Sequence, residues 1–248
     1  MTTRGEFERL RVVLVGARNP LNIGAAARAM SNFGFMKMRV VNPYKVAFRE
    51  AKSAVGASEL LAKAEEFDTV SEAVADCTLV VGTTAVGKRE LQHPLKELED
   101  GARVMRKRMG SSKVALLFGS EKIGLTNEEL SHCHWLMRIP TREEHRSMNL
   151  GQAVGICLYE IARGMRGSGR AVGKKKVATA GDVERIAVVM LEALEGSLYS
   201  RPGASRVAEE KLRRMLRRME LSPNDAAVML GMMRQILWKL KNGSANGG

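Results

Sequence analysis

Five short apolar runs, separated by longer helical patterns, constrain the fold of this chain more than any other feature of its sequence. Each run is continuously apolar instead of alternating with polar residues, which is typical of strands covered on both faces, as in a parallel sheet. Strands that alternate with helices predict an α/β domain with a mostly parallel sheet. The runs are Leu10–Val15, Met38–Val41, Leu79–Val81, Val114–Phe118 and Trp135–Ile139.

Helix signals follow three of these runs. Ile23–Phe33 is rich in alanine and precedes Gly34, a residue suited to end a helix. Thr126–Glu129 reads as a capping box that opens a second helix. Leu150–Ala162 carries apolar residues at helical spacing. The dinucleotide fingerprint G-x-G-x-x-G is absent, so a nucleotide-like ligand would need a different kind of site.

The last third of the chain has a different organisation. Residues 164–181 contain five glycines and the run Lys174, Lys175, Lys176, which predicts a flexible basic linker. Three amphipathic helices are expected over residues 182–241, and residues 242–248 are expected to be disordered. The predicted organisation is therefore an α/β domain over 1–163, the linker, and a small helical domain over 182–241.

The charge of the chain points to an anionic partner. Its net charge is +13, and residues 164–248 hold 16 Lys and Arg against 8 Asp and Glu, whereas residues 1–163 hold 24 against 19. Such a surplus favours nucleic acid or a membrane surface as the partner. The alternative is a basic protein whose charges are only solvated.

Cysteine usage and hydropathy predict a cytoplasmic protein that binds neither membrane nor metal. No apolar run approaches the ~18 residues that span a bilayer, and residues 1–10 lack the apolar core of a signal peptide. Cys77, Cys133 and Cys157 are widely spaced in apolar contexts and read as reduced packing residues. Ser131–His134 contains two histidines and a cysteine, which are common metal ligands, but no second cluster at ligand spacing accompanies it.

Three further segments carry the functional signal. They are N-I-G-A-A-A-R at Asn22–Arg28, A-L-L-F-G-S-E-K-I-G-L at Ala115–Leu125, and Ile139–Gly155, which runs from a strand end through a polar loop into a helix. A helix that starts after such a loop directs backbone N–H groups at a ligand. In this order and spacing the three segments resemble the signature motifs of the SPOUT superfamily of RNA methyltransferases. The match is to its TrmH family, in particular the TrmJ-like branch that methylates ribose 2′-hydroxyls in tRNA, and it covers roughly residues 9–163.

The resemblance implies a SPOUT fold with a C-terminal trefoil knot, a homodimer, and S-adenosylmethionine (SAM) as cofactor, bound by three loops. Ile139 and Leu150 could sandwich the adenine, backbone groups near Ser147 and Met148 could hydrogen-bond its edges, and Gly119 would let the backbone approach the ligand closely. The implied cofactor-binding residues are Thr83, Thr84, Ala85, Phe118, Gly119, Ile139, Arg146, Ser147, Met148, Asn149 and Leu150.

Arg28 is the residue that the resemblance marks as catalytic. Since a guanidinium is always protonated, we expect it to stabilise the developing alkoxide and to bind the flanking phosphate. Composition alone favours an exposed arginine in an alanine-rich helix, and the resemblance reverses that preference. Asn22, Glu121, Ser147 and Asn149 also occupy motif positions and are predicted to order the loops or the nucleotide, with Glu121 pairing with Arg28.

Basic residues of the linker and of the middle C-terminal helix are the predicted RNA contacts, because lysine and arginine rows neutralise phosphates. Together with Arg28 they are Lys174, Lys175, Lys176, Arg213, Arg214, Arg217 and Arg218. The C-terminal helices could instead serve dimerisation. The function expected is SAM-dependent 2′-O-methylation of tRNA at nucleotide 32 of the anticodon loop. The alternatives are methylation of ribosomal RNA and RNA binding without catalysis.

Overall fold

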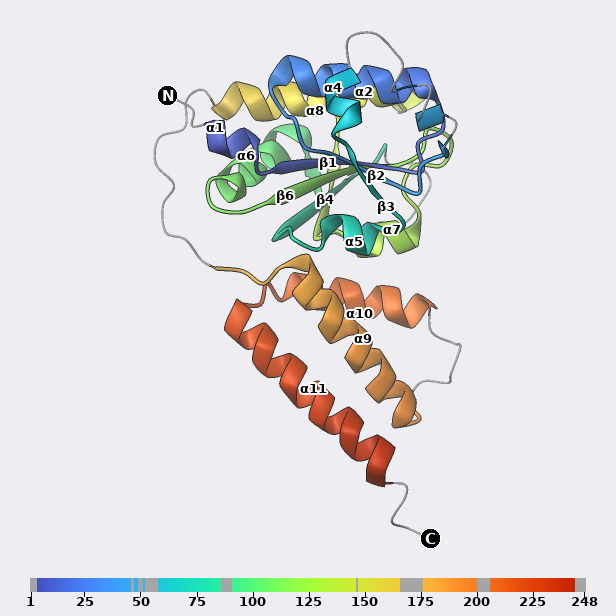
Figure 1. Ribbon diagram of the computed structural model, residues 1–248, viewed down its shortest axis with the longest axis vertical. Helices are drawn as coiled ribbons and strands as arrows, with labels where there is room; N and C mark the ends of the chain where they lie inside the picture. Colours follow the sequence, from blue (N-terminus) through green and yellow to red (C-terminus); the bar gives the residue numbers. More distant parts are fainter. Residues whose placement is uncertain are drawn as a thin grey trace.

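The computed structural model describes residues 4–45, 47–48, 51, 58–85, 91–145, 147–165, 176–199 and 206–243. These residues form a seven-stranded sheet of order β3-β2-β1-β6-β4-β7-β5, in which every pairing between strands is parallel (Figure 1). The strands are β1 (Leu10–Val15), β2 (Met38–Val41), β3 (Glu65–Phe67), β4 (Leu79–Thr83), β5 (Leu95–Glu97), β6 (Val114–Phe118) and β7 (Trp135–Arg138). The predicted α/β class is confirmed, whereas the trefoil knot stays a prediction.

All five predicted strands are present, and the sequence missed β3 and β5. Both missed strands have three residues, lie at the two edges of the sheet, and carry charged residues such as Glu65 and Lys96. An edge strand covered on fewer sides needs no apolar run, so the pattern that revealed the central strands is absent from them.

Helices cover both faces of the sheet. Side chains of alternate strand residues point to opposite faces, so Val12 and Leu14 pack in one core cluster with α2, α6 and α8, while Val13 and Val15 pack in the other with α5 and α7. This two-sided cover explains the continuous apolarity of the central runs. The helices of this part are α1 (Arg4–Phe7), α2 (Pro20–Phe33), α4 (Ser58–Ala62), α5 (Val70–Val74), α6 (Leu98–Met109), α7 (Asn127–Ser131) and α8 (Leu150–Met165), with a short 3-10 helix η1 (Glu143–His145) before α8.

The packing of α2 against α8 brings two of the sequence motifs together. α2 begins at Pro20, three residues earlier than predicted, because Asn19 caps it by accepting a hydrogen bond from the Leu21 N–H. Gly151, in the first turn of α8, lies so close to α2 that an added Cβ would be 2.5 Å from the Cβ of Ala25. The start of α8 is therefore held directly against the first turns of α2.

Three helices, α9 (Ala180–Gly196), α10 (Arg206–Arg218) and α11 (Pro223–Gly243), form a unit that lies beside α5 and α7 (Figure 1). Its first turn is tied to the sheet domain, because Ala180 N–H donates to the Cys77 carbonyl at 2.7 Å and Gly181 N–H donates to the Ala75 carbonyl at 3.0 Å. The last residues of the predicted linker thus belong to a docked helix. Lys174 and Lys175 lie outside the described residues, as does the chain after residue 243.

The three cysteines pack in the two core clusters of the sheet domain. Cys77, Cys133 and Cys157 are buried and form no disulfide, and burial raises the pKa of each thiol to about 12, so the thiols stay neutral. In these same residues no group of three or more His, Cys, Asp and Glu side chains could hold a metal ion. None of the helices described is both long and apolar enough to cross a membrane.

Candidate active site

A cavity of about 410 Å³ opens at the carboxyl ends of β4, β6 and β7. Its size falls within the roughly 300–1,000 Å³ that is usual for small-molecule sites. Asn149 is not among the described residues that line it, and Arg146 lies outside the described residues. The predicted cofactor-binding residues that do line it are Thr83, Thr84, Ala85, Phe118, Gly119, Ile139, Ser147, Met148 and Leu150.

The walls of this cavity combine apolar surface with backbone that is already hydrogen-bonded. The Thr83 hydroxyl donates to the Leu117 carbonyl at 2.8 Å, and the Thr84 N–H donates to the Met137 carbonyl at 3.0 Å. These bonds fix the loop after β4 against the neighbouring strands. Ile139 and Leu150 add apolar surface from two other segments, so the cavity can take the flat, apolar face of an adenine.

Gly119 lines the cofactor cavity and also packs closely against the protein's own backbone. A Cβ at this position would lie 2.1 Å from the carbonyl carbon of Gly124 and 2.2 Å from the Leu125 nitrogen. The folded loop therefore leaves no room for a side chain at Gly119, while its close approach to a ligand stays a prediction. Gly124 has φ of 69° and donates to the Ser120 carbonyl at 2.9 Å, so both glycines shape the loop Ser120–Gly124 that borders the cavity.

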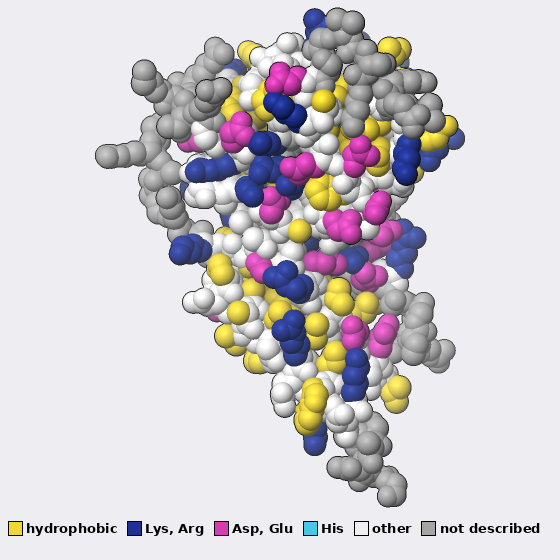
Figure 2. Space-filling model, viewed as in Figure 1, with side chains coloured by type: hydrophobic (Ala, Val, Ile, Leu, Met, Phe, Trp, Pro, Cys, Tyr) yellow, Lys and Arg dark blue, Asp and Glu magenta, His cyan; other side chains and the backbone are white. Residues whose placement is uncertain are grey.

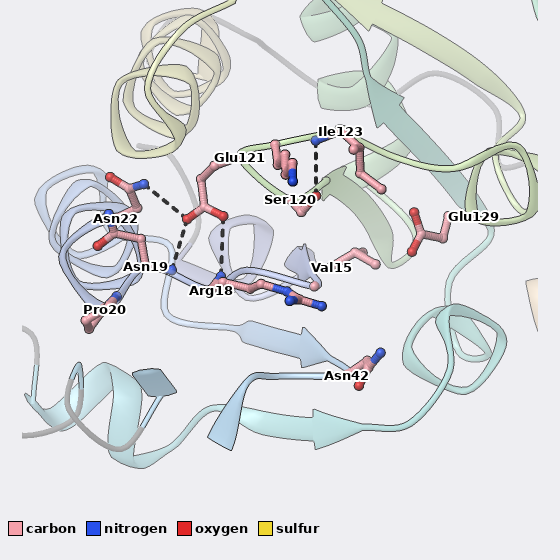
Figure 3. Close-up of a pocket in the computed structure, with 13 residues that line it drawn as sticks. Val15, Arg18, Asn19, Pro20, Asn22, Asn42, Ser120, Glu121, Ile123 and Glu129 are labelled. Atoms are coloured by element: carbon pink, nitrogen blue, oxygen red, sulfur yellow. Dashed lines mark hydrogen bonds between the residues drawn. The ribbon is translucent and has the colours of Figure 1, made fainter. Parts of the chain in front are cut away.

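A chain of hydrogen bonds joins three of the predicted catalytic residues. The Asn149 side-chain amide donates to Asn22 Oδ1 at 2.7 Å, and the Asn22 amide donates to Glu121 Oε1 at 3.1 Å. Glu121 also accepts the backbone N–H groups of Arg18 and Asn19, each at 3.3 Å (Figure 3). Because Asn149 Oδ1 accepts the Gly151 N–H at 2.9 Å, the chain ties the start of α8 to the loop that enters α2.

The same bonds keep the Glu121 carboxyl ionised. Partial burial by itself would raise its pKa, but hydrogen bonds from its own backbone, from Asn22 and from the Arg18 and Asn19 N–H groups outweigh that effect and lower the pKa below its ordinary value. An ionised carboxylate accepts all of these donors at once. Glu121 therefore holds the loop before α2 and the Asn22 side chain in place, and its carboxylate oxygens accept hydrogen bonds from protein groups.

Arg28 stands apart from this chain. Its side chain is exposed on α2, and within the described ranges it makes no ion pair or hydrogen bond. The predicted pair between Glu121 and Arg28 is not formed, since Glu121 binds Asn22 and two backbone groups instead. Six residues turn the helix by about 600°, so Arg28 and Asn22 lie on different sides of α2. The guanidinium is thus available to a substrate.

Three of the arginines predicted to contact RNA are buried between α10 and its neighbours, which contradicts that prediction. The exposed fractions of the Arg213, Arg214 and Arg217 side chains are 11, 8 and 1%. Arg213 donates to Glu184 at 2.8 Å and pairs with Glu209. Acidic side chains from other turns and from α9 cover these charges, so they cannot meet phosphates in this structure. Arg218 and Lys176 are exposed.

Basic and acidic side chains are accordingly interspersed on the face of the molecule that Figure 2 shows. On the face shown in Figure 2, Asp and Glu side chains gather along the junction between the sheet and the helical unit, beside exposed Lys and Arg. Two members of that junction, Glu184 and His132, were missed by sequence reasoning. Glu184 Oε2 lies 3.7 Å from His132 Nδ1 and 3.7 Å from Arg217. The sequence gives no signal for a contact between residues so far apart along the chain.

The fold and the cavity together define an α/β methyltransferase, and comparison with known proteins identifies the family. Residues 9–159 match the model of the SpoU rRNA methylase family. The chain belongs to this family, as the motifs predicted. It is an enzyme that transfers methyl groups, with SAM as the methyl donor.

Individual relatives extend over both parts of the chain. The chain is 34% identical over 235 residues to the tRNA (cytidine/uridine-2′-O-)-methyltransferase TrmJ of Sodalis glossinidius, an alignment that covers 93% of this chain and 92% of the relative. It is 35% identical over 238 residues to the TrmJ of Yersinia pestis, with the same coverage. The crystal structure of TrmJ from Z. mobilis ZM4 superposes with a TM-score of 0.79 at 29% identity, over 91% of this chain and 98% of that one.

Proposed function

We propose that the protein methylates a ribose 2′-hydroxyl of tRNA, and that its target is nucleotide 32 in the anticodon loop. Support for a tRNA substrate comes from the near full-length similarity to proteins named tRNA (cytidine/uridine-2′-O-)-methyltransferases, which includes the helical unit. Nucleotide 32 is carried by the motif resemblance alone. A homodimer in the cytoplasm completes the proposal, and the exposed apolar side chains Leu21 (79%) and Tyr159 (54%) on the α2–α8 layer fit an interface there.

Methyl transfer to a ribose hydroxyl is an in-line displacement that depends on orientation. SAM would supply the electrophilic methyl group, and Ile139 and Leu150 would hold its adenine. The Asn149–Asn22–Glu121 chain would keep the loop of the cofactor cavity in fixed register with α2. A ribose hydroxyl is a weak nucleophile at neutral pH, so the oxygen needs a positive group as its charge develops.

The single observation that carries this proposal is the state of Arg28. The side chains of Asn22, Glu121 and Asn149 are hydrogen-bonded to one another. In contrast, the described contacts leave the Arg28 guanidinium unpaired and exposed on α2, the helix that these bonds position. A permanently charged donor that no protein group neutralises suits an alkoxide and its flanking phosphate. A protein that only bound RNA would not need the cavity and the chain together.

The proposal is tested by incubating the full chain with methyl-labelled SAM and, separately, with total tRNA and ribosomal RNA. The expected result is labelled tRNA whose digestion products place a 2′-O-methyl group at nucleotide 32. Label in ribosomal RNA alone would favour the second substrate, and label elsewhere in tRNA would correct the position. Binding of tRNA and SAM without label would favour the non-catalytic alternative.

A further inference from the structure

A second and larger cavity, of about 870 Å³, lies beside the cofactor cavity at the carboxyl ends of β1 and β6 (Figure 3). The loop Ser120–Gly124 lines both cavities and separates them. Its lining includes Asn22 and Glu121, two of the predicted catalytic residues, but the sequence motifs did not predict the cavity itself. The predicted cofactor-binding residues that line a cavity all lie in the cofactor cavity, so the second cavity is available to a different ligand.

The position of this cavity in the sheet favours a ligand. β1 and β6 are neighbours, but β1 leads through α2 towards β2 on one side, while β6 leads through α7 towards β7 on the other. Helices that leave adjacent parallel strands in opposite directions open a crevice at the carboxyl edge, and open α/β sheets bind ligands at such a switch point. Here the crevice is separate from the cofactor cavity, which lies over β4, β6 and β7.

The basic side chains that line the crevice are available to a ligand, whereas its acidic side chains accept hydrogen bonds from the protein. Glu121 accepts the Arg18, Asn19 and Asn22 donors, and Glu129 accepts the Thr126 N–H at 2.6 Å in the capping box of α7. In contrast, the side chains of Arg18 and Lys122 are exposed and, among the residues the structure describes, form no ion pair or hydrogen bond. The crevice therefore offers two available cations, while its carboxylates are occupied by protein donors.

Polar and apolar groups suited to a nucleotide accompany these cations. Ile123, at the tip of the dividing loop, is 63% exposed and lines the crevice, so it offers a flat apolar contact that a base or ribose could cover. The Asn42 side chain, from the end of β2, and the Arg18 guanidinium both extend into the crevice (Figure 3). An amide can pair with a base edge, and a guanidinium with a phosphate.

We propose that this crevice binds the RNA strand adjacent to the methylated nucleotide, with Arg18 and Lys122 contacting its phosphates and Ile123 packing against a neighbouring base. The inference rests on the proposed function, because it names the part of the substrate that lies beside the reacting ribose. Only the loop Ser120–Gly124 would separate that strand from SAM in the neighbouring cofactor cavity. Two phosphates bound here would orient the target ribose towards the cofactor cavity.

The test is the double variant Arg18→Ala/Lys122→Ala of the full chain, which keeps the Arg18 backbone N–H that Glu121 accepts. The Michaelis constant for tRNA should rise at least about tenfold, and the slope of log affinity against log salt concentration should become shallower by up to about two, since each lost phosphate contact removes about 0.7–0.9. Because Lys122 also lines the cofactor cavity, SAM affinity is measured by calorimetry and the RNA assays are run at saturating SAM. Lys107→Ala is the control, because Lys107 is an exposed cation in the last turn of α6, which leads to the amino end of β6, whereas the crevice lies at the carboxyl ends of β1 and β6.

Direct RNA binding by filter retention keeps this test separate from the proposed function. If the parent chain methylates no RNA, the proposed function fails, while weaker RNA binding by the double variant than by Lys107→Ala still supports the crevice. Equal RNA affinity and salt slope in the parent and the double variant would overturn the crevice proposal, even with methylation intact. The proposal would also be overturned if a free mononucleotide competed with labelled RNA as effectively as unlabelled RNA does, since binding would then not require an RNA strand.

Discussion

Arg28 of α2 and three arginines of α10 lie in opposite environments, although the sequence predicts all four as RNA contacts. Arg28 on α2 is exposed and makes no ion pair within the described part of the chain. Arg213, Arg214 and Arg217 on α10 are nearly buried and face Glu184, Glu209 and Glu210. The difference arises because α10 packs between α9 and α7, whereas the α2 turn that bears Arg28 faces solvent. A basic row therefore indicates substrate only when no acidic neighbour from another helix covers it.

The buried arginines of α10 hold the junction between α9, α10 and α7 together, but burying their charges opposes folding. Burial lowers the pKa of Arg217 to about 10, although the nearby Glu184 carboxylate opposes this, so Arg217 stays charged at neutral pH. Its Nε and Nη1 atoms have no hydrogen-bond partner among the groups that the structure describes. Removing the one carboxylate that offsets several buried cations should therefore be more damaging than removing an exposed one.

The largest expected effect is on stability, from Glu184→Ala. This change leaves Arg217 and one side of Arg213 uncompensated in a buried junction, and breaking a buried pair typically costs about 3–5 kcal/mol. Denaturant unfolding of the full chain should show this loss. Glu192→Ala is the control on the same helix: Glu192 is half-exposed, pairs with Lys241 at 3.2 Å, and should cost less than about 1 kcal/mol. Equal effects of the two changes would refute the contrast between buried and exposed charge.

The next effect is on catalysis, from Arg28→Ala. If the guanidinium stabilises charge that develops only in the transition state, its loss should reduce single-turnover methylation ~100–1,000-fold, or about 2.7–4 kcal/mol, with SAM affinity nearly unchanged. Arg28→Lys should also be slow, since lysine keeps the charge but lacks the planar fork. The unfolding free energy should hardly change, because Arg28 is exposed and forms no ion pair or hydrogen bond with a described group. Near-normal turnover would make Arg28 an ordinary surface residue.

Like the arginines, the strands and loops divide into those that the sequence predicted and those that it did not. The central strands were predictable because burial on both faces requires a continuous apolar run, as in β1 and β6. The cofactor loops were predicted from the family resemblance, which marks Phe118, Ile139 and Leu150. In the structure Phe118 ends β6, Ile139 follows β7 and Leu150 begins α8. β3 and β5 were missed because edge strands carry no comparable run.

The remainder of the site depends on tertiary contacts that no local pattern records. Asn22 and Asn149 are 127 residues apart and Arg18 and Glu121 are 103 apart, yet both pairs are hydrogen-bonded. The same holds for the Gly119 contact with the Gly124–Leu125 peptide, which only a folded loop creates. Opposite charge suggested a pair between Glu121 and Arg28. In the structure the Glu121 carboxylate instead accepts hydrogen bonds from two backbone N–H groups and from Asn22.

A smaller effect concerns acid sensitivity at the α7–α9 junction. Burial, reinforced by the charges of Arg213 and Arg217, lowers the pKa of His132 to about 3. Between pH 6.5 and 3 the unfolded chain binds a proton here that the folded chain does not, so the unfolding free energy falls as the pH falls, by up to about 1.4 kcal/mol per pH unit. His132→Asn should remove this part of the slope between pH 6 and 4, measured by denaturant unfolding. His145→Asn, at an exposed position in η1, should keep the parent slope, and an unchanged slope in His132→Asn would refute the assignment.

The smallest effect separates the two kinds of arginine on a single helix. Arg218 is exposed at the end of α10, whereas its neighbour Arg217 is buried. If the helical unit contacts tRNA, Arg218→Ala should make the slope of log affinity against log salt shallower by up to about 0.9, the contribution of one phosphate contact. Arg217→Met, which keeps much of the side-chain volume, should leave that slope unchanged under conditions in which the variant stays folded. A change in slope for Arg217→Met but not for Arg218→Ala would mean that α10 leaves its docked position to bind RNA. No change in either would leave dimerisation or domain attachment as the role of α10.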